Sequence, residues 1–234
     1  MKEIMELIAH RFNGLVNVLI VDDERQVLKS LKRNFISPLF RLSVAESYDE
    51  AMRAIVDNHA SWHCWVLDID LSGNHTCLEI MNRFPRFPFV IVLSGLQSMH
   101  RAAEAIQKGA FDVFDKDPES FERFYDETCK TAALGFLLGG KQTQYLPLYR
   151  LLCKSVITSI EAWAEHACVS VRQLHRITEL HPVNTPKASL ALYYGMYYLL
   201  YKGMPPFDET FPRDCFPENA NFFEECLAYC SRNF

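Results

Sequence analysis

Five side chains in the first half of this sequence could together handle a phosphoryl group. Two adjacent carboxylates, Asp22 and Asp23, follow the apolar run NVLIV, and Asp68 follows CWVL. The Ser94 hydroxyl and the Lys116 ammonium group stand at the ends of two further apolar segments. Converging carboxylates repel one another unless a divalent cation joins them, and Mg²⁺ prefers such oxygen ligands. A carboxylate could then attack phosphorus in line, while the cation, the hydroxyl and the ammonium group bind the phosphoryl oxygens.

These side chains need a scaffold that brings them to one edge, and the surrounding pattern predicts one. Five short apolar segments are expected as strands: Asn17–Asp22, which suits a strand buried on both faces, Arg41–Ala45, Cys64–Asp68, Phe89–Leu93 and Phe111–Phe114. A stretch with helical periodicity follows each strand: Glu24–Phe35, Tyr48–Asn58, Cys77–Phe84, Ser98–Lys108 and Glu119–Ala132. The alternation predicts an α/β, doubly wound, five-stranded parallel sheet. Ligands bind such a sheet at the carboxyl ends of its strands, where the five side chains fall.

Four motifs occur in order over roughly residues 16–132: VLIVDDE, LDIDLSG, VIVLSG and KGAFDVFDK. With them the chain resembles the receiver domain (CheY-like, flavodoxin-like) of two-component response regulators. The resemblance implies that Asp68 accepts the phosphoryl group and that Asp22, Asp23 and Asp68 hold Mg²⁺. It makes Ser94 the switch hydroxyl and Lys116 the phosphate-pairing lysine. It also implies a sensor histidine kinase as phosphodonor and no turnover enzyme. The plainer alternative is that these residues only cap strand ends.

Three departures from the family pattern affect the expected mechanism. The position three residues before the lysine, usually aromatic, is Val113, with Phe111 and Phe114 nearby. The loop after the predicted phosphoacceptor is one residue longer than usual, and Asp70 adds a negative charge there that we expect to alter the lifetime of the phosphoryl group. The lysine is followed by Asp117 instead of proline. In this family the face built by residues 98–108 and 111–114 usually pairs receivers, which implies a homodimer upon phosphorylation.

The composition changes after the receiver-like part. Gly135–Pro147 combines glycines, polar residues and a proline, which is typical of a hinge. We therefore expect an amino-terminal extension (1–15), a receiver domain (16–132), a linker (133–147) and an all-α domain (148–234). In this last part, Leu148–Ile160 and Ile160–His166 are predicted helices. Ser170 is a good N-cap for a further helix after a three-residue turn, which is a helix-turn-helix pattern.

The segment WAEHACVSVRQLHRITELHPVNTPKASL resembles the first helix-turn-helix of AraC/XylS-type regulators. The resemblance spans roughly residues 148–234, makes Pro186–Tyr201 the long connecting helix, and implies DNA contacts by three side chains: Arg172, Gln173 and Arg176. The second helix-turn-helix would fall on residues 207–234, where the pattern is degenerate. Cys215 stands in place of a glycine, four prolines lie within the unit or directly before it, and Asn219–Tyr229 contains no arginine or lysine.

Charge leaves two kinds of output open. The chain has a net charge of −5, and residues 147–234 contain eight basic and nine acidic side chains, a net of −1. A DNA-binding module usually presents a basic face. The basic residues of this part cluster in the first unit, so one helix-turn-helix could still enter a major groove. The alternative is that the helical domain binds a protein partner, and a third possibility is an unphosphorylated scaffold.

The remaining features predict an ordinary cytoplasmic protein. The first residues contain no signal-peptide core, no segment is long enough to cross a membrane, and eight cysteines without a CxxC pair suggest reduced thiols. Buried inert thiols are favoured over a metal site at Cys215, Cys226 and Cys230. The run LALYYGMYYLLY is expected to place Leu192, Met196, Leu199 and Leu200 in the core, flanked by tyrosines. Three histidines are expected on the surface: His63, His75 and His100.

Overall fold

The structure is a computed structural model, and it describes residues 15–57, 62–95, 99–141, 143–157, 159–180 and 185–201. Its central element is a five-stranded parallel sheet in the order β2-β1-β3-β6-β7. The strands are β1 (Val16–Val21), β2 (Phe40–Ala45), β3 (Cys64–Asp68), β6 (Val90–Ser94) and β7 (Asp112–Asp115). Every residue of β1, β3 and β6 is buried, as expected for strands covered on both faces. The predicted five-stranded parallel sheet is confirmed.

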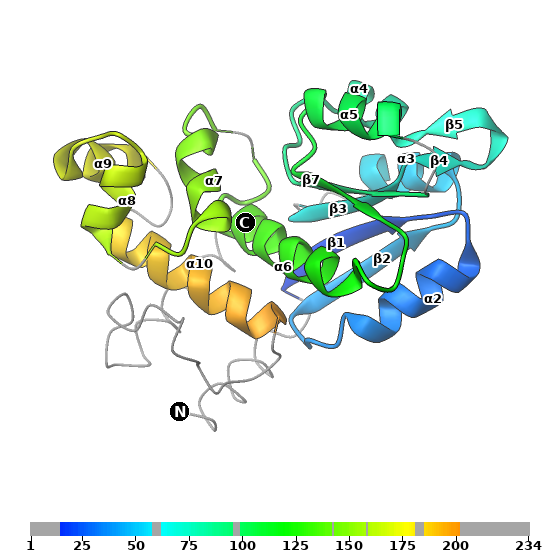
Figure 1. The fold of residues 1–234 in the computed structure, drawn as a ribbon, viewed down its shortest axis with the longest axis horizontal. Helices are drawn as coiled ribbons and strands as arrows, with labels where there is room; N and C mark the ends of the chain where they lie inside the picture. Colours follow the sequence, from blue (N-terminus) through cyan, green and yellow to red (C-terminus); the bar gives the residue numbers. More distant parts are fainter. Residues whose placement is uncertain are drawn as a thin grey trace.

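Helices cover both faces of this sheet (Figure 1). On one face lie α3 (Tyr48–Asp57), α4 (Cys77–Arg83) and α5 (Met99–Gln107), and on the other lie α2 (Arg25–Asn34) and α6 (Phe121–Leu137). Each helix buries an apolar stripe against the strands, such as Leu28 and Leu31 of α2. Two separate apolar clusters result, one on each side of the sheet.

A small second sheet lies in the loop after Asp68. Strand β4 (Asp70–Leu71) pairs antiparallel with β5 (His75–Thr76) around a single 3₁₀ turn, η1 (Ser72–Asn74). Gly73 adopts φ +80°, a left-handed conformation that glycine takes at no steric cost. The sequence did not predict this hairpin, although the extra length of the loop was visible. Thr76 ends the hairpin and begins α4 through a capping box with Glu79.

The second half of the described chain is helical. It contains α7 (Leu146–Lys154), α8 (Ile160–His166), α9 (Val171–Thr178) and α10 (Pro186–Tyr201), which we call the helical segment. The helix predicted over residues 148–160 is wrong in extent, because α7 ends at Lys154. The chain is extended at Ser155, and the Ile157 N–H then donates to the Tyr194 hydroxyl of α10 at 2.8 Å. A tertiary hydrogen bond thus replaces further helical turns.

The predicted linker is also wrong at its beginning. Helix α6 continues through residues 133–137, all of which are buried. Gly135 lies inside this helix, and a Cβ atom built there would come within 1.8 Å of the His63 carbonyl oxygen. This glycine therefore permits close packing of α6 against the start of β3 and provides no hinge. The domain boundary itself remains a prediction.

Helix α10 packs along α6, so the helical segment joins the core on that side of the sheet (Figure 1). Two buried hydrogen bonds of 2.8 Å fix its end: Ser37 Oγ donates to the Leu199 carbonyl, and the Tyr125 hydroxyl donates to the Leu200 carbonyl. The core positions predicted on this helix are confirmed. The tyrosines expected on its flanks are different, because Tyr193 and Tyr194 are also buried. The helix is enclosed on nearly all sides.

Several predictions fall outside the described residues. These are the amino-terminal extension up to residue 14, the degenerate second helix-turn-helix over 207–234, and the three cysteines Cys215, Cys226 and Cys230. Among the described cysteines, Cys64, Cys77, Cys129 and Cys153 are buried thiols, while Cys168 is exposed. Within the described ranges, no helix has both the length and the apolar character that a membrane crossing requires.

The surface position predicted for His63 is wrong, because the side chain is only 4% exposed. Its Nδ1 atom accepts a hydrogen bond from the Asn17 N–H at 2.9 Å, and its ring packs edge-on against Phe136. Burial lowers the pKa of His63 to about 4 from an ordinary value of 6.5. A proton on Nδ1 would also point at the Asn17 N–H, so only the neutral ring fits.

We expect this histidine to make the fold acid-sensitive. The folded-state pKa lies below the unfolded one, so the stability contribution is complete above pH 6.5 and is lost as the pH falls toward 4. The loss is about 3 kcal/mol of unfolding free energy at most, at about 1.4 kcal/mol per pKa unit. Urea unfolding of wild type and His63→Gln between pH 7 and 4 measures it. His100→Gln, at an exposed position, is the control, and equal pH slopes in all three proteins would contradict the assignment.

Candidate functional site

The candidate site lies at the carboxyl edge of the parallel sheet. Asp22 directly follows β1, Asp68 ends β3, Ser94 ends β6, and Lys116 directly follows β7. Parallel strands place all their carboxyl ends at one edge, so the sheet brings together side chains that are up to 94 positions apart in the sequence. Two backbone hydrogen bonds extend the ladder there: Ile69 N donates to the Leu93 carbonyl, and Lys116 N donates to the Ser94 carbonyl.

Lys116 joins the carboxylates of this pocket. Its Nζ atom lies 2.8 Å from Oδ2 of Asp22 and 2.8 Å from Oδ2 of Asp68. The Asp22 side chain is fully buried, and Asp68 is 3% exposed. A third acid, Glu24, approaches the same ammonium group at 3.2 Å from the exposed rim. One half-buried cation thus bridges two of the three predicted carboxylates.

Burial controls the protonation of these groups. Removal from water raises the pKa of Asp68 to about 7, and the neighbouring Asp22 charge adds to this, although the Lys116 hydrogen bond works against it. The pKa of Asp22 is raised for the same main reason. Burial by itself would lower the pKa of Lys116, but its hydrogen bonds to both carboxylates outweigh burial and raise it. The pocket therefore contains more negative charge than one lysine can neutralise.

The carboxylates fit a small divalent cation. One oxygen each from Asp22, Asp23 and Asp68 lies within 4.8 Å of the others. Oxygens around an octahedral Mg²⁺ at about 2.0–2.1 Å stand roughly 3 to 4 Å apart, so small side-chain rotations suffice. Asp23 is half-buried and keeps one side of the cluster open to water. Among the described residues no other acid, cysteine or histidine group is arranged for a metal in this way.

The other predicted pocket residue, Ser94, is buried on the same edge. Its hydroxyl donates to the Gly95 carbonyl at 2.9 Å, so it is hydrogen-bonded at the beginning of the following loop. A rotation about one bond would free this hydroxyl for an acceptor at the strand end. Ser94 therefore stands at the end of β6, the strand next to β3, at the same edge of the sheet as Asp68.

Two partners of the site were not foreseen. Glu24 contacts Lys116, and the only signal for it was its place as the third acid in a run of three. Arg101 of α5 forms an ion pair with Asp70, the residue two positions beyond Asp68. This pair neutralises the charge that the sequence placed at the pocket mouth, and no local spacing pattern connects the two residues.

The three predicted DNA-contacting residues lie on α9, and all three are exposed. Helix α9 packs against α8, and the connecting turn contains Cys168 in a left-handed conformation at φ +52°. Arg172 and Arg176 extend from the helix surface. Gln173 has a structural task as well, because its Oε1 atom accepts from the Ser170 N–H at 2.8 Å in the capping box that begins α9. The described geometry brings none of these residues near the carboxylate pocket.

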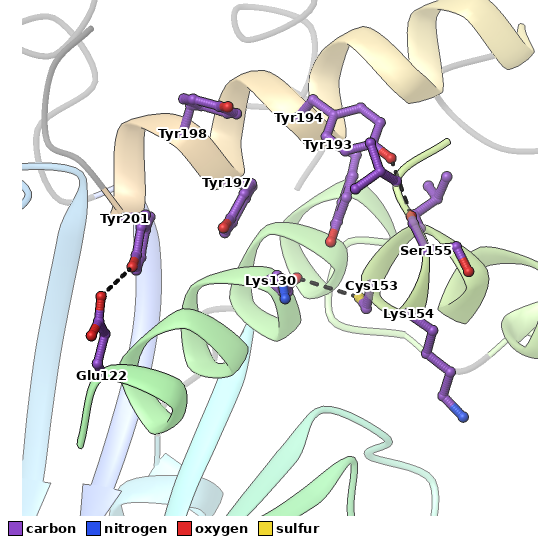
Figure 2. Close-up of a pocket in the computed structure, with 12 residues that line it drawn as sticks. Glu122, Lys130, Cys153, Lys154, Ser155, Tyr193, Tyr194, Tyr197, Tyr198 and Tyr201 are labelled. Atoms are coloured by element: carbon purple, nitrogen blue, oxygen red, sulfur yellow. Dashed lines mark hydrogen bonds between the residues drawn. The ribbon is translucent and has the colours of Figure 1, made fainter. Parts of the chain in front are cut away.

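A separate cavity of about 550 Å³ lies between α6, α7 and α10 (Figure 2). Tyrosines of α10 form most of one wall, and Lys130 of α6 and Cys153 of α7 contribute to the opposite side. Two contacts cross from helix to helix: the Tyr201 hydroxyl donates to Glu122, and the Cys153 thiol donates to the Lys130 carbonyl. No residue of the carboxylate pocket lines this cavity.

Comparisons with known proteins concern the first half of the chain. A sequence profile of the family described as response regulator receiver domain matches residues 18–124. An NtrX-like response regulator of Rickettsia conorii is 34% identical over 106 residues, which are 43% of this chain and 22% of that protein. The Rickettsia bellii counterpart is 33% identical over 113 residues, 44% of this chain and 22% of that protein. The chain thus spans about a fifth of the length of these curated relatives.

Solved structures of receiver domains are similar to a part of this chain. The receiver domain of NtrX from Brucella abortus is 30% identical with a TM-score of 0.36, covering 46% of this chain and 90% of that one. A response regulator receiver domain protein from Clostridium thermocellum is 24% identical with a TM-score of 0.39, covering 43% and 82%. Residues 18–124, which the family profile matches, contain the strand ends that carry the acids, the hydroxyl and the lysine. Residues 18–124 of this chain are a response regulator receiver domain.

Proposed function

We propose that this protein is a response regulator of a two-component system and is phosphorylated on Asp68. The observation that supports this best is the contact of Lys116 Nζ with both Asp22 and Asp68 at 2.8 Å, inside a cluster of three carboxylates. Burying two acids around one lysine costs folding free energy, because the charged groups lose their contact with water. A function at this site accounts for an arrangement that stability alone does not favour. Acceptance of a phosphoryl group explains each member of the cluster.

The proposed reaction is an in-line transfer to a carboxylate. An Asp68 oxygen attacks the phosphorus of a phosphohistidine, the P–N bond breaks, and an acyl phosphate forms while the histidine nitrogen receives the bond's electron pair. Asp22, Asp23 and Asp68 would hold Mg²⁺, which when bound offsets charge on the phosphoryl oxygens. Lys116 exchanges its bond to Asp68 for one to a phosphoryl oxygen, and Ser94 donates a hydrogen bond to another.

A sensor histidine kinase is the proposed phosphodonor, in a cytoplasmic setting. The receiver accepts one phosphoryl group on its own side chain, so we regard it as a signalling component and not a turnover enzyme. A cavity of about 400 Å³ beside Lys116, between α2 and the start of α6, leaves the lysine reachable from outside. In the phosphorylated state we propose a homodimer, as is usual for receivers of this family.

For the output we propose DNA binding by an AraC-like helix-turn-helix. Its support is the arrangement of α8 and α9: two contacting helices, a short turn, and a capped second helix with exposed Arg172 and Arg176. Such a helix can place arginines on base edges or phosphates of a major groove. Protein binding by the helical segment is the second candidate, favoured by the net charge of −1 over residues 147–234.

DNA binding is tested with a pool of genomic duplex fragments across a salt series, with and without Mg²⁺ and beryllofluoride, a phosphoryl mimic. Selective retention is expected to weaken at high salt. In Arg172→Ala we expect the slope of log affinity against log salt to fall by about one if this arginine contacts a phosphate. Arg33→Ala, an exposed arginine of α2, is the matched control. Retention of no fragment while beryllofluoride is still bound would support a protein partner instead.

A further inference from the structure

The aromatic side chains of β7 are directed toward α6. The Phe114 ring packs edge-on against Phe124 of α6, with centroids 6.0 Å apart, and belongs to the apolar cluster on that side of the sheet. Phe111, just before β7, packs against the same cluster. Val113, where this family usually has an aromatic residue, faces the opposite cluster under α5. The rings of Phe111 and Phe114 therefore lie on the side of the sheet that the helical segment covers.

Arg150 of α7 holds the beginning of β7. Its guanidinium carbon stands 4.1 Å from the centre of the Phe111 ring, and its Nη2 atom donates to the Gly109 carbonyl at 3.3 Å. No carboxylate among the described residues forms an ion pair with this half-buried side chain, and its Nε atom is buried without a partner in the same part of the chain. The two interactions of the Arg150 guanidinium group, with the Phe111 ring and the Gly109 carbonyl, therefore depend on the position of residues 109–111.

The end of the same strand leads into the carboxylate pocket. Only the four residues of β7 separate Phe111 from Lys116, and hydrogen bonds to β6 make them a stiff connection. Helix α7 is in turn tied to α8, because Trp163 Nε1 donates to the Leu148 carbonyl at 3.1 Å. A continuous set of contacts therefore runs from Lys116 through β7 and Arg150 to the helices that carry the predicted output.

We propose that the helical segment senses the state of Asp68 through β7, with Arg150 as the coupling residue: its contact with Phe111 and Gly109 is formed when Asp68 is unmodified and weakens when Asp68 is phosphorylated. This inference rests on the proposed phosphorylation of Asp68. Lys116 now bridges two carboxylates, and its ammonium group must shift to bind a phosphoryl oxygen. In this proposal the shift displaces β7, the strand that ends just before Lys116. The Arg150 contact fits the unmodified position, so a displacement of β7 can only reduce it.

Coupling between two sites is reciprocal, so the direction of the change in beryllofluoride affinity can be predicted. If modification of Asp68 weakens the Arg150 contact, then removal of the contact must favour modification. We therefore expect Arg150→Leu, and independently Phe111→Leu, to bind beryllofluoride about fivefold more tightly than wild type, at the lower end of usual site-to-site coupling. The double variant is expected to gain no more than either single variant, since both remove one contact.

The experiment titrates the full chain with beryllofluoride in excess Mg²⁺ and follows the bound ligand by ¹⁹F NMR. Arg33→Leu makes the same change at an exposed position of α2 and should bind as wild type does. Hydrogen exchange of residues 146–154 is measured in parallel, and it should become faster in wild type when beryllofluoride binds but stay unchanged in Arg150→Leu.

The outcomes separate the inference from the function on which it rests. Saturable binding to wild type with equal or weaker affinity in both Arg150→Leu and Phe111→Leu overturns the coupling and leaves the phosphorylation of Asp68 intact. No saturable binding to wild type refutes the proposed phosphorylation, and the coupling falls with it. Tighter binding in both variants, together with faster exchange of α7 in the wild type alone, supports both.

Discussion

Asp68→Asn is expected to reduce phosphoryl acceptance from acetyl phosphate to background while the fold is kept. The amide has nearly the same shape as the carboxylate, so packing at the end of β3 should be unchanged. It is a poor nucleophile, however, and it offers Mg²⁺ no negative charge. Loss of the nucleophile removes the reaction at this position, because the acyl phosphate forms on the Asp68 carboxylate itself.

The measurement is incorporation of the phosphoryl group by intact-protein mass spectrometry, in Mg²⁺ and in excess chelator. Asp70→Asn is the matched control, since Asp70 lies two residues away and is paired with Arg101 outside the carboxylate cluster. This control should be phosphorylated in the presence of Mg²⁺. Full incorporation in Asp68→Asn would show that the acceptor lies elsewhere and would refute the assignment of Asp68.

Gly135→Ala is expected to destabilise the protein by about 3 kcal/mol or more, among the largest effects of adding one methyl group. The new Cβ would lie 1.8 Å from the His63 carbonyl oxygen and 2.7 Å from its carbonyl carbon. Both are backbone atoms at the start of β3, so no flexible side chain can move aside. Helix α6 would have to shift outward and lose part of its buried contact with the sheet.

Urea unfolding at pH 7 measures this change. Gly95→Ala is the comparison, because a Cβ at Gly95 meets no atom within 4 Å and the residue is exposed. We expect that control to stay within about 0.5 kcal/mol of wild type. If Gly135→Ala is as stable as Gly95→Ala, then α6 does not approach β3 as closely as described, and the hinge predicted for this segment would regain support.

The sequence by itself determined the receiver part of the fold. Short apolar runs alternating with amphipathic stretches allow few arrangements, and the handedness of β–α–β connections reduces these to one parallel sheet. The positions of the five candidate side chains follow from this order, since each stands at a strand end and parallel strands share one carboxyl edge. Asp22, Asp68 and Lys116 could therefore be placed together before any distance was known.

Tertiary structure decided what depends on contacts between distant segments. Gly135 looked like a hinge residue because glycine is locally permissive, yet its role is set by the His63 backbone 72 positions away. His63 looked like a surface residue because histidine is polar, yet its ring accepts from Asn17 inside the core. The Arg150–Phe111 contact is equally invisible locally, since no periodicity relates α7 to β7. The local sequence pattern predicts whether a side chain faces the core or the solvent. Which distant residue it contacts there depends on the packing of the whole chain.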